Sequence, residues 1–135
     1  MAEVNRRQFL DGAVGAAAAS YLVTKGSAVA QDSPNNEVVV GVMGLSRGRA
    51  LANSFAKRPG VRVKYVADVD KNRAAAGAAT VEKATGKAAT PTQDFRRILD
   101  DNEVDALICA APNHWHAPAT ILACSAGKNV YCEKP

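Results

Sequence analysis

The chain has 135 residues, of which 47% are hydrophobic and 22% are charged, a composition typical of one ordinary soluble domain. The 17 Lys and Arg residues against 13 Asp and Glu give a formal net charge of +4, without the basic cluster that would indicate nucleic-acid binding. The three cysteines, Cys109, Cys124 and Cys132, are an odd number without zinc-finger spacing, which excludes a disulfide scaffold.

Residues 1–30 have the three zones of an export signal. A polar start containing Arg6 and Arg7 is followed by an apolar stretch at residues 12–23 and by a small-residue end at 28–30. The arginine pair is typical of the twin-arginine route, which carries folded proteins and therefore favours a bound cofactor. Because the apolar stretch is shorter than the ~18 residues of a membrane-spanning helix, we expect no stable membrane anchor. We predict a twin-arginine signal peptide over 1–30, a linker over 31–36 and a periplasmic or secreted protein.

From residue 37 onward, short β-branched runs alternate with segments of helical periodicity. Strands are expected at residues 37–43, 61–67, 104–110 and 129–132, with a weaker strand at 87–90. Helices are expected between them, at residues 46–57, 70–85, 92–101 and 116–126. This alternation predicts the α/β class, as a Rossmann-type doubly wound parallel sheet that binds its ligand at the carboxyl ends of the strands.

Single residues support these boundaries. Asp70 has the position of an N-cap for the second helix, and Gly86 follows its last residue, as a C-terminal glycine does. In the short third helix, Phe95, Ile98 and Leu99 are expected to face the core.

The turn after the first expected strand is rich in glycine. In a Rossmann domain, this turn binds the dinucleotide pyrophosphate through backbone N–H groups and a helix N-terminus. The match to G-x-G-x-x-G is imperfect, because Ser46 replaces the second glycine and Gly48 comes one residue early. We predict cofactor contacts from Gly44, Ser46, Arg47 and Gly48. The alternative is a turn that needs glycine only for its backbone angles.

Asp68 ends the second expected strand, close to the ~20 residues after the first glycine at which an acid holds the adenosine ribose. A carboxylate there accepts hydrogen bonds from both ribose hydroxyls and repels a 2′-phosphate, which favours NAD over NADP. NADP stays open as an alternative, because Arg73 could accommodate that phosphate. The competing interpretation makes Asp68 only a helix cap, but Asp70 is the better cap.

The last segment carries the most specific motifs, a Pro-Asn-x-x-His loop at residues 112–116 and the run Ala-Gly-Lys-Asn-Val-Tyr-Cys-Glu-Lys-Pro at 126–135. Together they resemble the N-terminal domain of the Gfo/Idh/MocA oxidoreductases, over residues 37–135. The resemblance implies that Pro112, Asn113 and His116 lie beside the nicotinamide ribose and the substrate. It also implies that Glu133 helps hold the cofactor, that Lys134 binds the substrate hydroxyl and helps move its proton, and that Pro135 fixes the turn. Hydride leaves a carbinol carbon more easily when a base takes the hydroxyl proton.

Each of these residues also has a simpler interpretation. Asn113 could be a helix cap, Trp115 an aromatic wall residue and Lys134 a surface lysine. No metal site is expected, because His114 and His116 have no evident third ligand. The three thiols are expected to be inert in apolar surroundings, with Cys132 partly reachable.

Members of the family continue past Glu-Lys-Pro into a second domain, which supplies a further catalytic residue, the substrate pocket and usually the oligomer interface. We therefore expect a sheet that is incomplete at its C-terminal edge, and a sugar or polyol substrate and a homo-oligomer only in the longer protein. Three functions remain open. They are an exported NAD(P)-dependent oxidoreductase, a glycosidase of the same family that uses NAD without net redox change, and a non-catalytic nucleotide-binding fragment.

Overall fold

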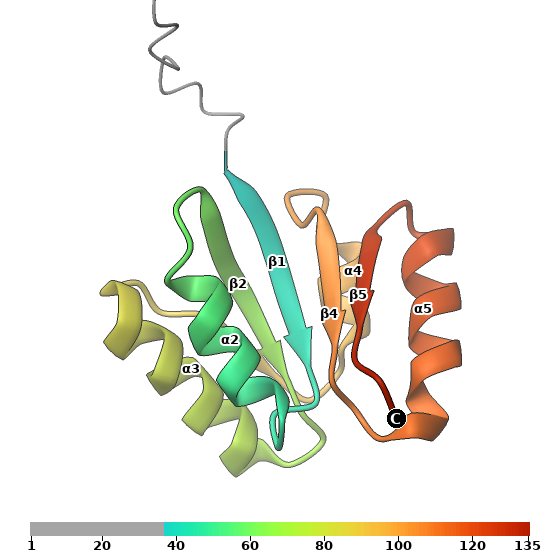
Figure 1. Ribbon diagram of the computed structural model, residues 1–135, viewed down its shortest axis with the longest axis horizontal. Coiled ribbons are helices and arrows are strands. Elements are labelled where there is room, and N and C mark those ends of the chain that lie inside the picture. Colours follow the sequence, from blue (N-terminus) through green and yellow to red (C-terminus); the bar gives the residue numbers. More distant parts are fainter. Residues whose placement is uncertain (1–36) are drawn as a thin grey trace, which may run out of the picture. The chain divides into compact units, whose positions relative to one another are not determined.

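The computed structural model describes residues 37–135 and shows one parallel sheet with helices on both faces (Figure 1). Its strands are β1 (Val38–Met43), β2 (Val61–Ala67), β3 (Thr90–Thr92), β4 (Ala106–Cys109) and β5 (Asn129–Cys132). They lie in the order β3-β2-β1-β4-β5, and every neighbouring pair is parallel. This is the strand order of a doubly wound Rossmann sheet, so the predicted fold class is confirmed.

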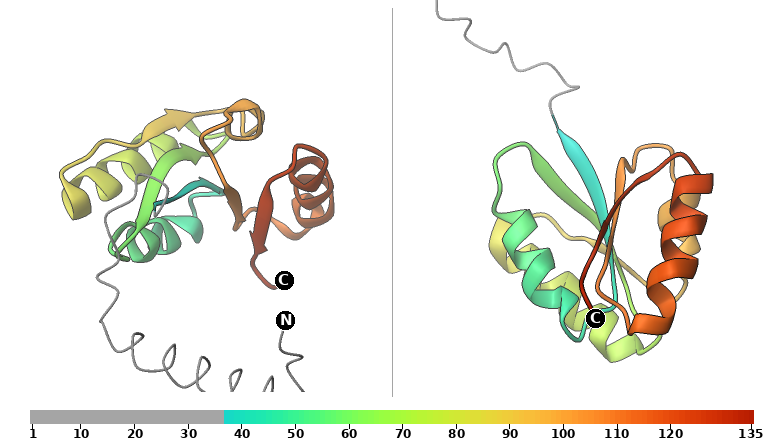
Figure 2. Two further views of the ribbon diagram at one scale, coloured as in Figure 1. Left: turned by 90° about the horizontal axis from the view of Figure 1, so that it is seen from above. Right: turned by 45° about the vertical axis from the view of Figure 1, so that its right-hand side comes forward.

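Two helices cover each face of the sheet (Figure 2). On one face, α2 (Gly48–Ala56) and α3 (Lys71–Thr85) pack over β1 and β2. On the other, α4 (Arg96–Asp100) and α5 (His116–Ser125) pack over β1 and β4. A single 3-10 turn, η2 (Asn113–Trp115), leads from β4 into α5.

The central strand β1 is buried on both faces, which explains its unbroken β-branched sequence. Val39 belongs to the apolar cluster beneath α4 and α5, whereas Val40 and Val42 belong to the cluster beneath α2 and α3. The inward residues expected for the third helix are confirmed, since Phe95, Ile98 and Leu99 are all buried.

A glycine in β1 allows α4 to approach the sheet closely. A Cβ atom on Gly41 would lie 2.3 Å from Cγ2 of Ile98, which is completely buried. The parallel pairing of β1 with β2 also shifts register between Val40 and Gly41. A side chain at position 41 would therefore push α4 away from the core.

The segment between α3 and α4 differs from the sequence prediction. The third strand lies at Thr90–Thr92 rather than at 87–90, and α4 begins at Arg96 rather than at residue 92. The Thr92 hydroxyl donates to the backbone carbonyl of Asp94 at 3.1 Å and accepts from its N–H at 3.2 Å. This local bonding competes with helix formation and delays the helix. Pro91 is tolerated because β3 is an edge strand.

The other boundaries are close to the prediction, although the first helix begins at Gly48 rather than at 46 and the fourth strand spans Ala106–Cys109 rather than 104–110. The caps of α3 are confirmed. Asp70 accepts from the N–H of Asn72 at 2.8 Å, and Gly86 adopts a left-handed conformation with φ of 72°.

A polar cluster lies at the middle of β2, beside the turn that follows α4. Lys64 forms ion pairs with Asp101 and Glu103, and the Tyr65 hydroxyl donates to Asp101 at 2.8 Å. The Lys64 ammonium and the N–H of Glu103 hold the pKa of the Asp101 carboxyl at about 2. This cluster joins the middle of β2 to the turn that follows α4, before the carboxyl end of the strand, where a Rossmann fold binds its ligand.

The predicted signal peptide at 1–30 and the linker at 31–36 lie outside the described residues. Within residues 37–135, none of the helices is long and apolar enough to span a membrane.

Candidate cofactor-binding site

A cleft of about 660 Å³ lies along the carboxyl ends of the strands. It is bounded by the turns that follow β1, β2, β3 and β4, where a doubly wound sheet binds its ligand. Of the residues predicted to bind a cofactor, Gly44, Ser46, Asp68 and Pro112 line it. The remaining lining residues are Met43, Ala67, Val69, Arg73, Gln93, Asp94, Phe95, Arg96, Ala110, Ala111, His114, Trp115 and Leu122.

The turn after β1 approaches the turn after β4 at Gly44. Gly44 has a φ of 87°, and a Cβ atom on it would lie 2.4 Å from the backbone nitrogen of Ala111. Only glycine combines that conformation with so close a contact. The N–H of Gly48 then donates to the carbonyl of Gly44 at 2.9 Å and begins α2.

Gly48 is needed for space rather than for its backbone angles. A Cβ atom there would lie 3.2 Å from both the Ala110 Cβ and a Val42 methyl group. The close helix–strand packing that it permits is one of the roles of glycine in a dinucleotide-binding turn. The turn at Gly44 and the α2 N-terminus behind it have the arrangement in which a dinucleotide-binding turn receives a pyrophosphate.

Asp68 connects the glycine turn to the end of β2. Its Oδ2 accepts a hydrogen bond of 2.7 Å from the N–H of Leu45, and its Oδ1 accepts one of 3.0 Å from the N–H of Asp70. The N-cap of α3 is Asp70, so Asp68 is not the cap. Its carboxylate instead lines the cleft, where it could accept hydrogen bonds from a ribose.

The β4–α5 loop forms an aromatic wall of the cleft. Trp115 packs edge-on against Phe95, with ring centroids 5.9 Å apart, and both residues line the cleft. Trp115 remains 37% exposed. Its predicted role as a wall residue is confirmed.

Sequence reasoning missed the part of the cleft that follows β3. Gln93, Asp94 and Arg96 line the cleft there, and the Gln93 side-chain amide donates to the carbonyl of Val69 at 2.8 Å. The signal that could have found them is their position directly after a strand. The strand expected at 87–90 ends two residues before β3 does, so the sequence pattern places these residues in the following helix.

The other predicted site residues lie outside the cleft lining. They are Arg47, Gly48, Asn113, His116, Glu133 and Lys134. Arg47 and Glu133 nevertheless join the glycine turn to the end of β5, with Arg47 Nε 3.8 Å from Glu133 Oε2. The N–H of Glu133 donates to the Cys109 carbonyl at 2.9 Å, and Lys134 is exposed directly after it.

Asn113 begins η2, and no side-chain hydrogen bond caps η2 or α5. Its alternative role as a helix cap is therefore not supported. His116 is the first residue of α5, and its Nε2 lies 2.9 Å from the Ala111 carbonyl. This bond fixes the loop that supplies Ala111 and Pro112 to the cleft.

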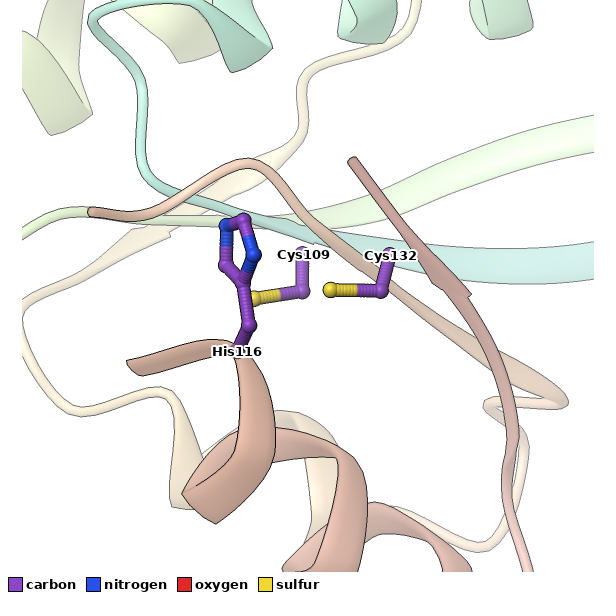
Figure 3. Close-up of side chains that lie close together, drawn as sticks. All are labelled: Cys109, His116 and Cys132. Atoms are coloured by element: carbon purple, nitrogen blue, oxygen red, sulfur yellow. The ribbon is translucent and has the colours of Figure 1, made fainter. Parts of the chain in front are cut away.

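His116 also lies beside two cysteines. One ligand atom from each of Cys109, His116 and Cys132 lies within 4.8 Å of the others (Figure 3). Cys109 is buried as expected, and burial raises the pKa of its thiol. The prediction of inert thiols in apolar surroundings is wrong for Cys124, which is exposed on α5. Cys132 is also exposed, as the expectation of a partly reachable thiol allows, because it lies on the edge strand β5.

Residues 36–135 match the model of the Gfo/Idh/MocA family, described as an oxidoreductase family with an NAD-binding Rossmann fold. The chain is 37% identical over 95 residues to inositol 2-dehydrogenase 2 of Saccharopolyspora erythraea, an alignment that covers 70% of this chain and 26% of that protein. It is 30% identical over 110 residues to a glycosyl hydrolase family 109 protein of Solibacter usitatus, covering 76% of this chain and 25% of that protein.

Among solved structures, the chain resembles myo-inositol dehydrogenase from Lactobacillus casei in complex with NAD(H) and myo-inositol. The TM-score is 0.63 at 27% identity, and the superposition covers 73% of this chain and 29% of that one. The chain thus spans about a quarter of the length of the curated relatives that it matches.

Proposed function

Because this chain belongs to the Gfo/Idh/MocA oxidoreductase family, of which it forms the NAD-binding Rossmann domain, we propose that it serves hydride transfer between NAD and a sugar or polyol. The observation that carries the proposal is the pairing of a bare glycine turn at Gly44 with the Asp68 carboxylate in one cleft. The kinship with an inositol dehydrogenase supports the substrate class.

The residues around the cleft fit a dinucleotide. The turn that follows Gly44 offers the backbone N–H groups of Ser46 and Arg47, at the N-terminus of α2, to the pyrophosphate, and Asp68 offers its carboxylate to the adenosine ribose. The same carboxylate disfavours the 2′-phosphate of NADP, although Arg73 also lines the cleft. When bound, the nicotinamide supplies an acceptor for the hydride of a carbinol carbon.

On the nicotinamide side, Lys134 is the residue we assign to catalysis. The backbone N–H of Glu133 donates to the Cys109 carbonyl and so holds Glu133 against the end of β4. Lys134 follows directly and therefore lies at the carboxyl edge of the sheet. There it would bind the substrate hydroxyl and take up its proton. Pro112 and Asn113, at the start of the β4–α5 loop, would border the nicotinamide ribose, and His116 would hold that loop through Ala111.

NAD binding can be measured on this chain alone. Trp115 is its single tryptophan and lines the cleft, so its fluorescence reports directly on the site. We expect a saturable change with NAD and a weaker response to NADP. A folded chain, by circular dichroism, whose fluorescence and calorimetric heat do not respond to NAD would overturn the cofactor assignment.

Catalysis is tested on the protein that carries this domain together with its substrate-binding part. We expect NADH to form with myo-inositol or a related polyol, and Lys134→Met to lower kcat by about 10²–10⁴-fold with little change in NAD affinity. Lys87→Met, at an exposed position after α3, is the matched control and should retain full activity. Equal activity of both variants would remove Lys134 from the mechanism.

A second candidate function is glycoside hydrolysis with NAD used in a transient redox cycle. The likeness to a glycosyl hydrolase family 109 protein favours it. The two activities differ in their products: a dehydrogenase releases NADH in proportion to substrate consumed, whereas the glycosidase releases a sugar with no net NADH. Measuring both products from one reaction decides between them.

We also propose that the protein is exported to the periplasm or beyond. Arg6 and Arg7, the short apolar stretch and the small-residue end support this assignment. Replacing both arginines with lysine should retain the protein in the cytoplasm with residues 1–30 uncleaved. Unchanged export of that variant would exclude the twin-arginine route.

A further inference from the structure

A buried cysteine, an edge-strand cysteine and a histidine converge beside the cleft, outside the cofactor site described above. Cys109 ends β4, Cys132 ends β5, and His116 begins α5. In the parallel pairing of β4 with β5, Cys109 and Cys132 are direct partners, so their side chains leave the sheet on the same face. Figure 3 shows both sulfur atoms directed toward the side on which His116 lies, with the His116 ring next to the Cys109 sulfur.

The His116 ring is held in the orientation that a metal ligand needs. Its Nε2 lies 2.9 Å from the Ala111 carbonyl, so a proton on Nε2 completes that hydrogen bond and leaves a lone pair on Nδ1. In Figure 3, the ring nitrogen next to the Cβ attachment lies on the side of the two sulfurs. Metal-binding histidines commonly donate their other ring N–H to a backbone carbonyl in this way.

The spacing of the three groups matches a common coordination set. All three ligand atoms lie within 4.8 Å of one another. Ligand atoms of a tetrahedral zinc site lie roughly 3.3–3.8 Å apart, given Zn–S of about 2.3 Å and Zn–N of about 2.0 Å. The exposed Cys132 side chain can close the remaining gap by rotation, and its exposure leaves a fourth position open to water.

We propose that Cys109, His116 and Cys132 form a binding site for one zinc-like divalent cation. Soft thiolates with an imidazole select zinc over magnesium or calcium, which prefer oxygen ligands. The ion would connect the ends of β4 and β5 to the start of α5. Pro112 follows the end of β4 by three residues, and Lys134 follows the end of β5 by two residues. Binding replaces the thiol protons of both cysteines, which leave to solvent.

The test uses the full chain, reduced and freed of metal, titrated with Co²⁺ and then with Zn²⁺. We expect one equivalent of Co²⁺ to produce a thiolate-to-cobalt charge-transfer band and tetrahedral visible absorption, both abolished by one equivalent of Zn²⁺. Zn²⁺ should also raise the thermal midpoint, because it binds the folded state. None of these readouts depends on NAD or on catalysis.

Three variants make the result specific. Cys132→Ser, at an exposed position, should remove the charge-transfer band without loss of the fold, and His116→Gln should weaken Co²⁺ binding. Cys124→Ser removes an exposed thiol outside the cluster and should bind like the parent. Absence of stoichiometric Co²⁺ binding in the reduced parent chain, or equal binding by Cys132→Ser, overturns the proposal. So does a Cys109–Cys132 disulfide in protein isolated from cells under thiol-trapping conditions, which would indicate a redox pair instead.

Discussion

The Asp68 carboxylate accepts a hydrogen bond of 2.7 Å from the backbone N–H of Leu45, and so joins the end of β2 to the glycine turn that follows β1. The two residues lie in different βα units. Their bond brings Asp68, which is predicted to bind the ribose, next to the glycine turn, which is predicted to bind the pyrophosphate. One side chain therefore both shapes the turn and offers its charge to the cleft.

Replacement of Asp68 should weaken NAD binding strongly. Asp68→Ala removes the charged acceptor for the ribose hydroxyls, and hydrogen bonds to charged groups contribute about 1.5–3 kcal/mol, so we expect Kd to rise about 10–100-fold. Titration of NAD followed by Trp115 fluorescence measures the change. Unchanged affinity in a folded Asp68→Ala chain would exclude Asp68 as the ribose ligand.

The neighbouring Asp70 gives the opposite pattern and serves as the control for Asp68. Its Oδ1 caps α3 through the N–H groups of Asn72 and Arg73. Asp70→Ala should cost about 0.5–2 kcal/mol of unfolding free energy through loss of the cap. We expect NAD affinity to stay within about twofold, since Asp70 is absent from the cleft lining. Urea denaturation with and without NAD separates the two effects.

Alanine at Gly44 should be far more damaging than alanine at Gly86. Both residues have positive φ, at 87° and 72°, but only Gly44 faces backbone, with Ala111 N at 2.4 Å from the added Cβ. Gly86→Ala should cost about 1–2 kcal/mol from backbone strain alone. Gly44→Ala adds a clash with the β4–α5 turn and should cost more, with loss of NAD binding. Equal destabilisation of the two variants in urea would show that the close approach at Gly44 is unimportant.

Stability in acid should depend on Asp101. The Lys64 ammonium, the Glu103 N–H and the Tyr65 hydroxyl lower the pKa of the Asp101 carboxyl from 3.8 to about 2. A carboxyl with a lowered folded-state pKa stabilises the fold above its unfolded pKa, and that contribution is lost as pH falls from about 4 to about 2. Asp101→Asn should therefore be less stable at pH 7 by about 1–2 kcal/mol, with the difference vanishing near pH 2.

Asp100→Asn, at the exposed neighbouring position, is the control for Asp101 and should follow the parent curve at every pH. Unfolding curves at several pH values provide the measurement. If Asp101→Asn and the parent keep a constant stability difference down to pH 2, the ion pair with Lys64 does not stabilise the fold.

Local sequence patterns predict most of the strands and helices of this structure. β1 is buried on both faces and therefore reads as an unbroken apolar run, while Asp70 and Gly86 mark the ends of α3 through their own backbone chemistry. The glycine turn and Asp68 were also predictable, because a parallel sheet brings the carboxyl ends of neighbouring strands to one edge. The short β3 and α4 were misplaced because side-chain bonding at Thr92 and the edge position of β3 override local propensity.

The sequence by itself determined the alternation of strands and helices, the strand edge along which the cleft lies and the acid beside it, because each depends on residues close together in the chain. Only the tertiary structure decided which distant residues meet. The contact of Gly44 with Ala111, the aromatic wall of Phe95 and Trp115, and the convergence of Cys109 with Cys132 arise from strand order and register. Strand order and register depend on packing across the whole sheet, and a short segment of sequence does not contain that information.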